Sequence, residues 1–153
     1  MDSKEGGNIG IPLDLIKYLY RWALKELEAS KTLLPRDGLN LKVAQSTSVL
    51  AAINPEFYSI WNRRRGLLQV GALDAAREYQ FTSLLLSKHP SKGRIWDYRN
   101  WLLIHYGNSL ANLEDRRDEL ICEMTADRYK CNYPSFQFRR TWILSRKYSF
   151  LEV

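Results

Sequence analysis

The sequence predicts an all-α protein in which antiparallel helical hairpins stack as an α-solenoid, a crescent of about seven helices. Three observations predict this fold. One set of residue types recurs at the same spacing in two tandem segments, and apolar residues recur at helical spacing between prolines and glycines. No segment shows the sustained alternation of polar and apolar residues that is typical of a β-strand.

The tandem motif has the spacing Pro-x5-Trp-x2-Arg-x2-Leu-Leu, and its second tryptophan follows the first by 35 residues. The first copy consists of Pro55, Trp61, Arg64, Leu67 and Leu68, and the second of Pro90, Trp96, Arg99, Leu102 and Leu103. A weaker third copy, 40 residues further on, consists of Phe136, Arg139, Trp142 and Ile143. Residues three and seven apart share a helix face. We therefore interpret the Pro, Trp and Arg positions of the first two copies as structural, together with Phe136 and Arg139 of the third. We expect the tryptophan to lie between adjacent hairpins, and the arginine to stack on an indole or donate to loop carbonyls.

The first 53 residues predict a leader and one helical hairpin. Residues 1–10 are polar and rich in glycine, so we expect a disordered leader. A helix is expected from Pro12 to about Leu33, where the turn 35–38 follows, and a second helix is expected from about Leu39 to Ile53. We assign residues 11–153 to one helical-repeat domain.

The remaining helices follow from the repeats, whose copies lie near residues 54–88, 89–130 and 131–153, the last one incomplete. We expect helices at 57–70 and 72–88, then a helix that follows the break at His89-Pro90 and runs as far as Tyr106, then a helix at 110–130 and a final helix that begins near Pro134. The first of these should end at Gly71 and the third at Gly107-Asn108. A small-residue stripe on the second, starting at Ala72, should let a neighbouring helix approach closely. Too few residues follow Trp142 to complete the last hairpin, so we expect either a fragment or short isoform, or an end that needs a covering partner.

The charge, the cysteine and histidine counts and the motifs of the sequence argue against several classes of function. The net charge of +6 is concentrated in residues 51–100, which include the run Arg63-Arg64-Arg65. Cys122 and Cys131 are expected to be reduced thiols, and two histidines are too few for a zinc site. We find no metal-ligand cluster, no paired nucleophile and base, no glycine-rich phosphate loop and no long apolar run. We therefore expect a cytoplasmic protein that does not insert into membranes and has no catalytic residue, metal site or cofactor of its own.

The residues of the motif resemble the repeat of protein prenyltransferase alpha subunits, which reads roughly Asn-Pro-x-Asn-Tyr-x2-Trp-x2-Arg. The resemblance lies in residues 54–64 and 89–101, with 132–139 as the third copy, and it extends over about 40–146. It is nearest to divergent members of that family rather than to the farnesyl- or geranylgeranyltransferase alpha subunits themselves.

This resemblance implies a crescent of hairpins that wraps a separate beta subunit. In that family the beta subunit holds the zinc, the isoprenoid diphosphate and the substrate cysteine. The alpha subunit supplies the scaffold and a few polar residues beside the diphosphate. The partners implied are therefore a prenyltransferase beta subunit and a protein substrate with a C-terminal cysteine.

The resemblance also indicates which residues lie near the diphosphate, although this chain departs from the family's pattern there. The Lys and Tyr of the family's second copy are replaced by Ser91 and Gly93, and the His of the third copy by Pro134. The remaining candidates are Lys92, Arg94 and Tyr133, whose cationic or hydroxyl groups would stabilise the charge that develops on the leaving group.

Two other functions remain open. A tetratricopeptide-like scaffold that binds peptides has a similar repeat length, but it requires small residues where this chain has Trp and Arg. RNA binding through the arginine run and exposed aromatic rings is the other alternative, although no recognised RNA-binding module is present, and we expect no nucleic-acid partner. Our leading hypothesis is an alpha-type prenyltransferase subunit whose transferase activity requires a beta subunit.

Overall fold

The computed structural model describes residues 11–30, 37–110, 120–125 and 132–149, and this part of the chain is helical with no strand. Its main helices are α1 (Leu13–Ala29), α2 (Asp37–Ile53), α3 (Tyr58–Gln69), α4 (Ala75–Lys88), α5 (Gly93–Leu110) and α7 (Tyr133–Ser149), and residues 120–125 are also helical. The predicted all-α class is confirmed. The expected leader 1–10 and much of the expected helix 110–130 lie outside the described residues, as does the first half of the turn expected at 35–38. The second half of that prediction is wrong, because α2 already begins at Asp37.

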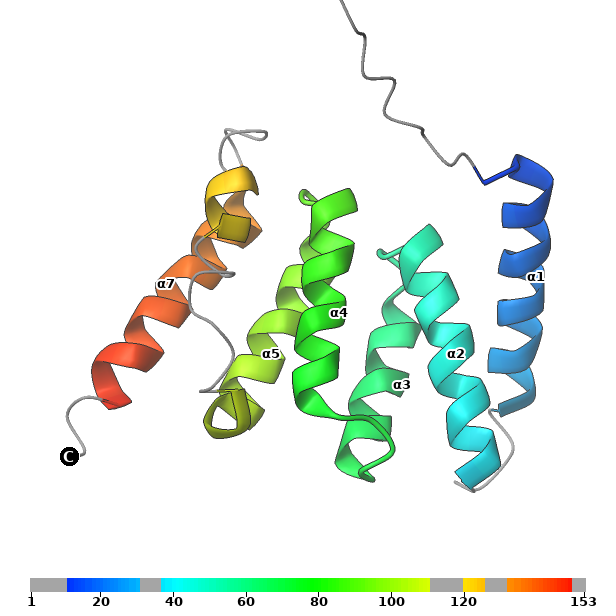
Figure 1. The fold of residues 1–153 in the computed structure, drawn as a ribbon, viewed down its shortest axis with the longest axis horizontal. Helices are drawn as coiled ribbons and strands as arrows, with labels where there is room; N and C mark the ends of the chain where they lie inside the picture. Colours follow the sequence, from blue (N-terminus) through cyan, green and yellow to red (C-terminus); the bar gives the residue numbers. More distant parts are fainter. Residues whose placement is uncertain (1–10, 31–36, 111–119, 126–131, 150–153) are drawn as a thin grey trace, which may run out of the picture.

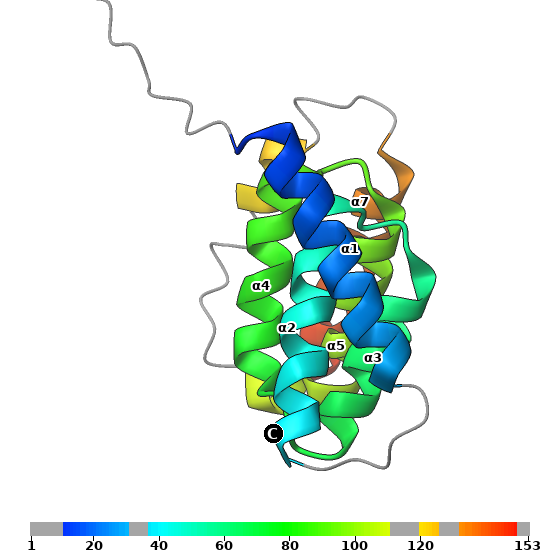
Figure 2. The ribbon, with the colours of Figure 1, turned by 90° about the vertical axis from the view of Figure 1, so that its right-hand side faces the viewer.

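Helices α1 to α5 form a row of antiparallel neighbours that follows the order of the sequence, and α7 lies beside α5 and runs in the same direction (Figure 1). Helix α2 packs against α1 and α3, α4 packs against α5, and α5 packs against α7 and contacts α3. Figures 1 and 2 show two layers, with α2 and α4 on one side and α3 and α5 on the other. The turns that contain Pro55 and Pro90 lie at one edge of the row, and α3, α5 and α7 all begin at this edge (Figure 1).

The turns between helices form where the sequence offers proline, glycine or a capping side chain. Pro55 and Pro90 lie in the turns that precede α3 and α5. Gly71 adopts a φ of 73°, a conformation that favours glycine, and it begins the turn that follows α3. Asp74 then caps α4, because its carboxylate accepts a hydrogen bond from the Arg77 backbone amide at 2.9 Å.

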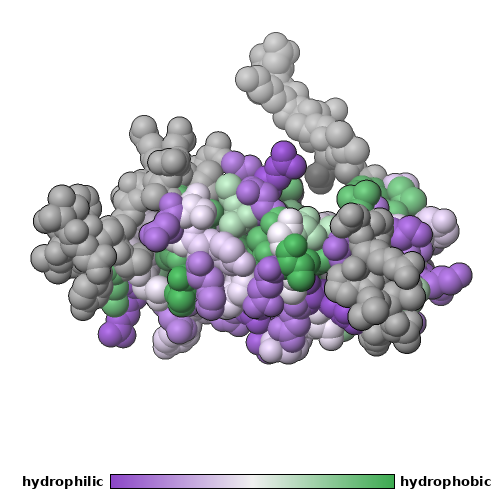
Figure 3. Space-filling model, turned by 90° about the horizontal axis from the view of Figure 1, so that it is seen from below, coloured by the Kyte–Doolittle hydropathy of each residue, from purple (hydrophilic) through white to green (hydrophobic). Residues whose placement is uncertain are grey.

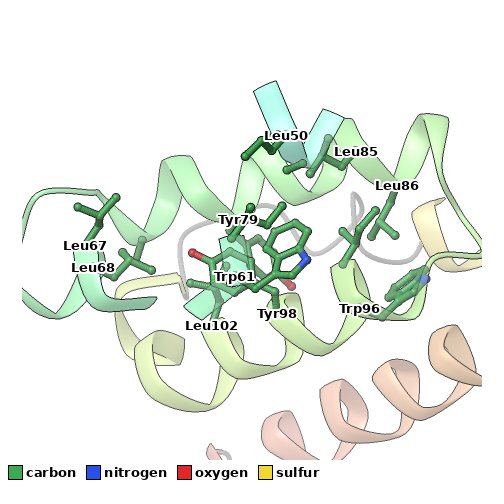
Figure 4. Close-up of a cluster of buried hydrophobic side chains, with 14 of the residues drawn as sticks. Leu50, Trp61, Leu67, Leu68, Tyr79, Leu85, Leu86, Trp96, Tyr98 and Leu102 are labelled. Carbon is green, nitrogen blue, oxygen red and sulfur yellow. The ribbon is translucent and has the colours of Figure 1, made fainter. Parts of the chain in front are cut away.

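The core runs along the interface between the layers (Figure 4). Trp61 and Trp96 are each 1% exposed, and leucines from α2, α3, α4 and α5 surround them. The Trp61 ring centroid lies 5.0 Å from that of Tyr98 on α5, and the Trp96 centroid lies 5.3 Å from that of Phe138 on α7. Each tryptophan therefore packs against the corresponding helix of the following copy, which fits the nearest-neighbour stacking of repeat proteins.

Two predicted helix bounds are wrong. Helix α4 begins at Ala75 rather than at residue 72, because residues 71–74 form the turn and the Asp74 cap, so Ala72 is not part of the helical stripe. Helix α5 does not end at Gly107-Asn108 but continues to Leu110, which is 5% exposed in the core. Burial of Leu110 offsets the weak helix propensity of Gly107, which is tolerated inside the helix.

Candidate functional site

Each motif tryptophan fixes the turn that precedes its own helix. The Trp61 Nε1 donates to the Pro55 carbonyl at 2.8 Å, and the Trp96 Nε1 donates to the Pro90 carbonyl at 2.9 Å. Both prolines are buried, so these bonds satisfy carbonyl groups that water does not reach. The spacing of six residues between Pro and Trp thus sets the geometry of the edge at which α3 and α5 begin.

Neighbouring turns are also joined to one another along this edge. The Asn132 Nδ2 donates to the same Pro90 carbonyl at 2.8 Å, and a ring nitrogen of His89 lies 3.0 Å from the Ala52 carbonyl at the end of α2. Asn132 is 4% exposed. The edge that carries the predicted site is therefore held by hydrogen bonds from one copy to the next.

The motif arginines are buried and bind the preceding helix of their own hairpin in the same way. The Arg64 Nη1 donates to Thr47 Oγ1 at 2.9 Å, Ser48 Oγ at 2.9 Å and the Ala44 carbonyl at 3.1 Å. Its exposed fraction is 2%. This grip ties α3 to α2.

Arg99 repeats the pattern 35 residues later, one copy further along the row. Its Nη1 donates to Thr82 Oγ1, to Ser83 Oγ at 2.9 Å and to the Tyr79 carbonyl at 3.0 Å. The acceptors precede each arginine by 17, 16 and 20 residues in both copies. The repeated unit therefore includes a Thr-Ser pair that the motif alone did not reveal.

The partners of the two guanidinium groups differ from the sequence-based expectation. The carbonyls that accept their hydrogen bonds belong to the preceding helix, and the rings that they contact are not indoles. Arg64 Cζ lies 4.6 Å from the Phe81 ring centroid, and Arg99 Cζ lies 3.7 Å from that of Tyr79. These rings belong to α4, so both arginine-bearing helices are held against it.

Arg64 also forms a buried ion pair with Glu78 of the next hairpin. Its Nε donates to Glu78 Oε2 at 2.8 Å and its Nη2 to Oε1, a two-pronged geometry that favours a strong pair. The Tyr98 hydroxyl donates to Glu78 Oε2 at 2.9 Å. Burial raises the pKa of Tyr98 far above its usual value, and the Glu78 carboxylate raises this pKa further. This cluster of Arg64, Glu78 and Tyr98 joins α3, α4 and α5, and sequence reasoning missed it because nothing in the motif marks Glu78.

The third copy is arranged differently. Phe136 is 48% exposed and Arg139 is exposed, whereas Phe138, two residues after Phe136, is 2% exposed. Phe138 occupies the place that Tyr98 takes in the second copy, since it packs on the preceding tryptophan. The register of the third copy is thus the expected one, but its aromatic and guanidinium groups lie at the surface.

The three residues predicted to lie near a diphosphate all lie at the edge where α5 and α7 begin. Lys92 and Tyr133 are exposed, Tyr133 by 81%. A Cβ added at Gly93 would lie 3.7 Å from Pro134 Cγ, so the segments that carry Lys92 and Tyr133 are adjacent. Arg94 instead points toward α3: its Cζ lies 5.1 Å from the Tyr58 ring centroid, and its Nη1 lies 3.6 Å from the Asp97 carboxylate. The structure therefore brings Lys92 and Tyr133 to one place, and Arg94 to the other side of α5.

Two further searches apply to the described residues alone. Within the ranges given above, no three His, Cys, Asp or Glu side chains gather closely enough to hold a metal ion. Among the same helices, none combines the length and the apolar composition that crossing a bilayer requires.

Comparison with known proteins gives relatives of one kind. Protein prenyltransferase alpha subunit repeat-containing protein 1 of Danio rerio is 28% identical over 158 residues, which cover 89% of this chain and 36% of that protein. The protein of the same name from Homo sapiens is 27% identical over 157 residues, covering 89% of this chain and 38% of its own length. The geranylgeranyl transferase type-2 subunit alpha of Saccharomyces cerevisiae is 28% identical over 106 residues, covering 66% of this chain and 32% of that protein.

No family model matches the chain. The chain spans about a third of the length of the curated relatives that it matches. Its similarity to the repeat-containing proteins nevertheless extends over most of its own residues. The chain is thus a homologue of the protein prenyltransferase alpha subunit repeat-containing proteins, which confirms the resemblance predicted from its tandem motif.

Proposed function

We propose that this chain is an alpha-type subunit of a heterodimeric protein prenyltransferase, an enzyme that transfers a farnesyl or geranylgeranyl group to a protein cysteine. The chain acts as a scaffold for a catalytic beta subunit. The observation that carries this proposal is the similarity, over 66% of the chain, to a geranylgeranyl transferase type-2 alpha subunit.

The structure supports a scaffold because its motif residues are used for packing. Trp61, Trp96, Arg64 and Arg99 are all buried between helices, where they hold hairpins together. The row of helices presents long lateral faces (Figures 1 and 2). A row of this kind offers a partner a large contact surface for its size.

The edge at which α5 and α7 begin is the place that we assign to the prenyl donor. We propose that Lys92 and Tyr133 lie beside the isoprenoid diphosphate when a beta subunit holds it, whereas Arg94, which was also predicted there, lies on the other side of α5 and points toward Tyr58. Lys92 and Tyr133 are exposed on adjacent turns and can approach an anion without rearranging the core. Positive charge and a hydroxyl donor there would stabilise the diphosphate as it leaves.

The proposal places the zinc, the isoprenoid diphosphate and the pocket for the C-terminal cysteine of the protein substrate on the beta subunit. The chemistry that the beta subunit and its zinc supply is activation of the substrate thiol. Such an enzyme would act on cytoplasmic proteins, which is the location that we propose for this chain.

Co-expression with each available prenyltransferase beta subunit tests the proposal. We expect one beta subunit to co-purify at a ratio of one to one, and the complex to transfer a farnesyl or geranylgeranyl group to a C-terminal cysteine peptide. In that complex, Lys92→Ala should raise the KM for the prenyl donor, whereas Lys88→Ala on the neighbouring helix should not. The absence of any complex at micromolar concentration, together with capture of extended peptides, would instead support a tetratricopeptide-like scaffold.

A further inference from the structure

Two arginine–aromatic pairs join α3 and α5 on their exposed sides. Arg65 of α3 places its Cζ 5.4 Å from the Trp101 ring centroid of α5, and Arg94 of α5 places its Cζ 5.1 Å from the Tyr58 ring centroid of α3. The pairs are reciprocal, since each helix contributes one arginine and one ring. We call these four residues the arginine seam.

The two pairs lie at two levels of the seam. Tyr58 and Arg65 are seven residues apart on α3, and Arg94 and Trp101 are seven residues apart on α5. At a rise of 1.5 Å per residue, seven residues of helix span about 10 Å. The seam therefore presents two guanidinium groups about 10 Å apart along the helix axes.

The guanidinium groups retain hydrogen-bond donors that the protein does not use. The Arg65 Nη1 donates to Asn62 Oδ1 at 3.1 Å, and Arg65 Nε is buried without a hydrogen-bond partner among the described residues, which leaves Nη2 as the donor that a partner could use. Arg94 has one neighbouring carboxylate, the exposed Asp97. Contact with a ring holds each guanidinium group in place, and the planar fork of an arginine suits a carboxylate.

The charge around the seam favours an acidic partner. Helices α3, α5 and α7 contain nine basic residues and one acidic residue, Asp97, whereas α2 and α4 contain three basic and two acidic. Two of the nine, Arg64 and Arg99, are buried, and the described surface of this layer retains Arg63, Arg65, Arg94, Arg139 and Arg140. Figure 3, seen from the lower ends of the helices, shows hydrophilic side chains along its lower edge, the side of α3 and α5.

The Trp101 ring of the seam is poorly suited to nucleic acid, whereas the Tyr58 ring is 52% exposed. Trp101 is stacked against Tyr98, with centroids 6.0 Å apart and an interplanar angle of 10°, and against His105 with centroids 4.6 Å apart. A nucleobase would need one of these ring faces, and internal neighbours already cover them. These contacts favour a protein partner.

We propose that the arginine seam binds an acidic helix of a partner protein that carries two carboxylates about seven residues apart, one for each guanidinium group. The inference rests on the proposed function, because it describes the chemistry of the surface that a beta subunit presents. The interaction adds specificity and a faster association to whatever apolar contacts the partner makes.

Charge reversal at Arg65 tests this inference in the co-expressed complex. Arg65→Glu is compared with Arg77→Glu, which makes the same charge change on an exposed position of α4. We expect Arg65→Glu to weaken the complex by roughly tenfold or more at 150 mM salt, and Arg77→Glu to leave the affinity within about twofold. Both variants should keep the helical circular dichroism of the parent, so the loss reports binding rather than folding. Equal affinity of the two variants for the beta subunit would overturn the inference while leaving the proposed function standing.

A second arm does not need the beta subunit. A synthetic helical peptide with two glutamates seven residues apart should bind the full chain with an affinity that falls as salt rises, and a peptide with glutamines at those positions should bind at least fivefold more weakly. Failure of the wild-type chain to bind any beta subunit would refute the proposed function, whereas equal binding of the two peptides would refute the seam. Binding of a labelled RNA homopolymer that Arg65→Glu abolishes would assign the seam to nucleic acid and overturn the choice of partner.

Discussion

The second and third copies of the motif place equivalent side chains in opposite environments. Trp96 and Arg99 of the second copy are 1% and 0% exposed, whereas Phe136 of the third copy is 48% exposed and Arg139 lies on the surface. The difference does not come from a shift of register, because Phe138 occupies the position of Tyr98. It comes from the neighbouring helix of the next copy: α7 covers Trp96, and no described helix covers Phe136.

The comparison shows that a hairpin of this fold completes the burial of its motif only with the help of the hairpin that follows. The first copy makes the same point, since Tyr98 of the second copy covers Trp61, and Glu78 of the next hairpin neutralises Arg64. Stability therefore resides largely in the contacts between hairpins, as in other stacked repeat proteins. Substitutions at equivalent positions should have effects that depend on the copy.

The largest difference is expected at the aromatic position. Trp96→Ala removes a buried indole and its hydrogen bond to the Pro90 carbonyl, so the free energy of unfolding should fall by about 4–5 kcal/mol. Phe136→Ala removes a half-exposed ring and should lower this free energy by about 1 kcal/mol. Urea unfolding followed by circular dichroism at 222 nm checks both values. Equal losses would show that the third copy is as buried as the second.

The next difference concerns the charged position. Glu78→Leu leaves the Arg64 cation buried without its carboxylate, and we expect the free energy of unfolding to fall by about 3 kcal/mol or more. Arg139→Met, at the equivalent arginine of the third copy, should change it by less than about 0.5 kcal/mol.

The double variant Arg64→Met with Glu78→Leu serves as the control for this charge effect. It removes both charges, so it should recover most of the loss caused by Glu78→Leu. A double variant that is no more stable than Glu78→Leu would show that packing, and not the unpaired charge, causes the loss.

Tyr98→Phe should have a smaller effect at neutral pH and a characteristic effect at high pH. It removes one hydrogen bond to Glu78, for a loss of about 1 kcal/mol at pH 7. Because the pKa of Tyr98 is raised in the folded chain, the unfolded chain releases this proton first, from about pH 10 upward. The stability that Tyr98 contributes is complete below that pH and declines above it by up to about 1.4 kcal/mol per pH unit.

The measurement is the free energy of unfolding between pH 8 and 11 for the wild-type chain and for Tyr98→Phe. The wild-type curve should fall more steeply above pH 10 than that of the variant. Parallel curves would mean that Tyr98 ionises in the folded protein as readily as in the unfolded one.

The smallest effect is expected at the link between the turns of the second and third copies. Asn132→Ala removes the hydrogen bond from Nδ2 to the Pro90 carbonyl and should lower the free energy of unfolding by about 1 kcal/mol. Asn108→Ala, at an exposed position of α5, is the matched control and should have almost no effect. Equal losses of unfolding free energy in the two variants would mean that the hydrogen bond between the turns does not stabilise the fold.

The sequence predicted the parts of this fold that depend on local chemistry. The breaks before Pro55 and Pro90 and the end of α3 at Gly71 follow from backbone restrictions, and they appear where expected. The continuation of α5 through Gly107 was not predictable in this way, because burial of Leu110 outweighs the local signal for a turn. The C-terminal end of α5 therefore depends on tertiary packing and not on the local sequence.

The partners of the motif arginines could not be predicted either, for a related reason. Thr47 and Thr82 are ordinary residues of a helix, and only the packing of one helix against another brings their hydroxyls to Arg64 and Arg99. The predicted site residues Lys92, Arg94 and Tyr133 were identified by resemblance, and their common location at one edge follows from the repeat. That Arg94 turns toward Tyr58 depends on side-chain packing that the spacing does not encode.

The hydrogen bonds from Arg64 and Arg99 to the preceding helix restrict where residues can be inserted into such a chain. In both copies the guanidinium group donates to a threonine 17 residues earlier, so the hydrogen bond requires a fixed number of residues between the two positions. One residue inserted within α2 after Thr47, or within α3 before Arg64, would rotate the guanidinium group about 100° around the helix axis relative to the hydroxyl and detach it. Insertions in the connections between hairpins should be tolerated better than insertions inside these helices, because they change the spacing of the copies and leave the contact between threonine and arginine intact.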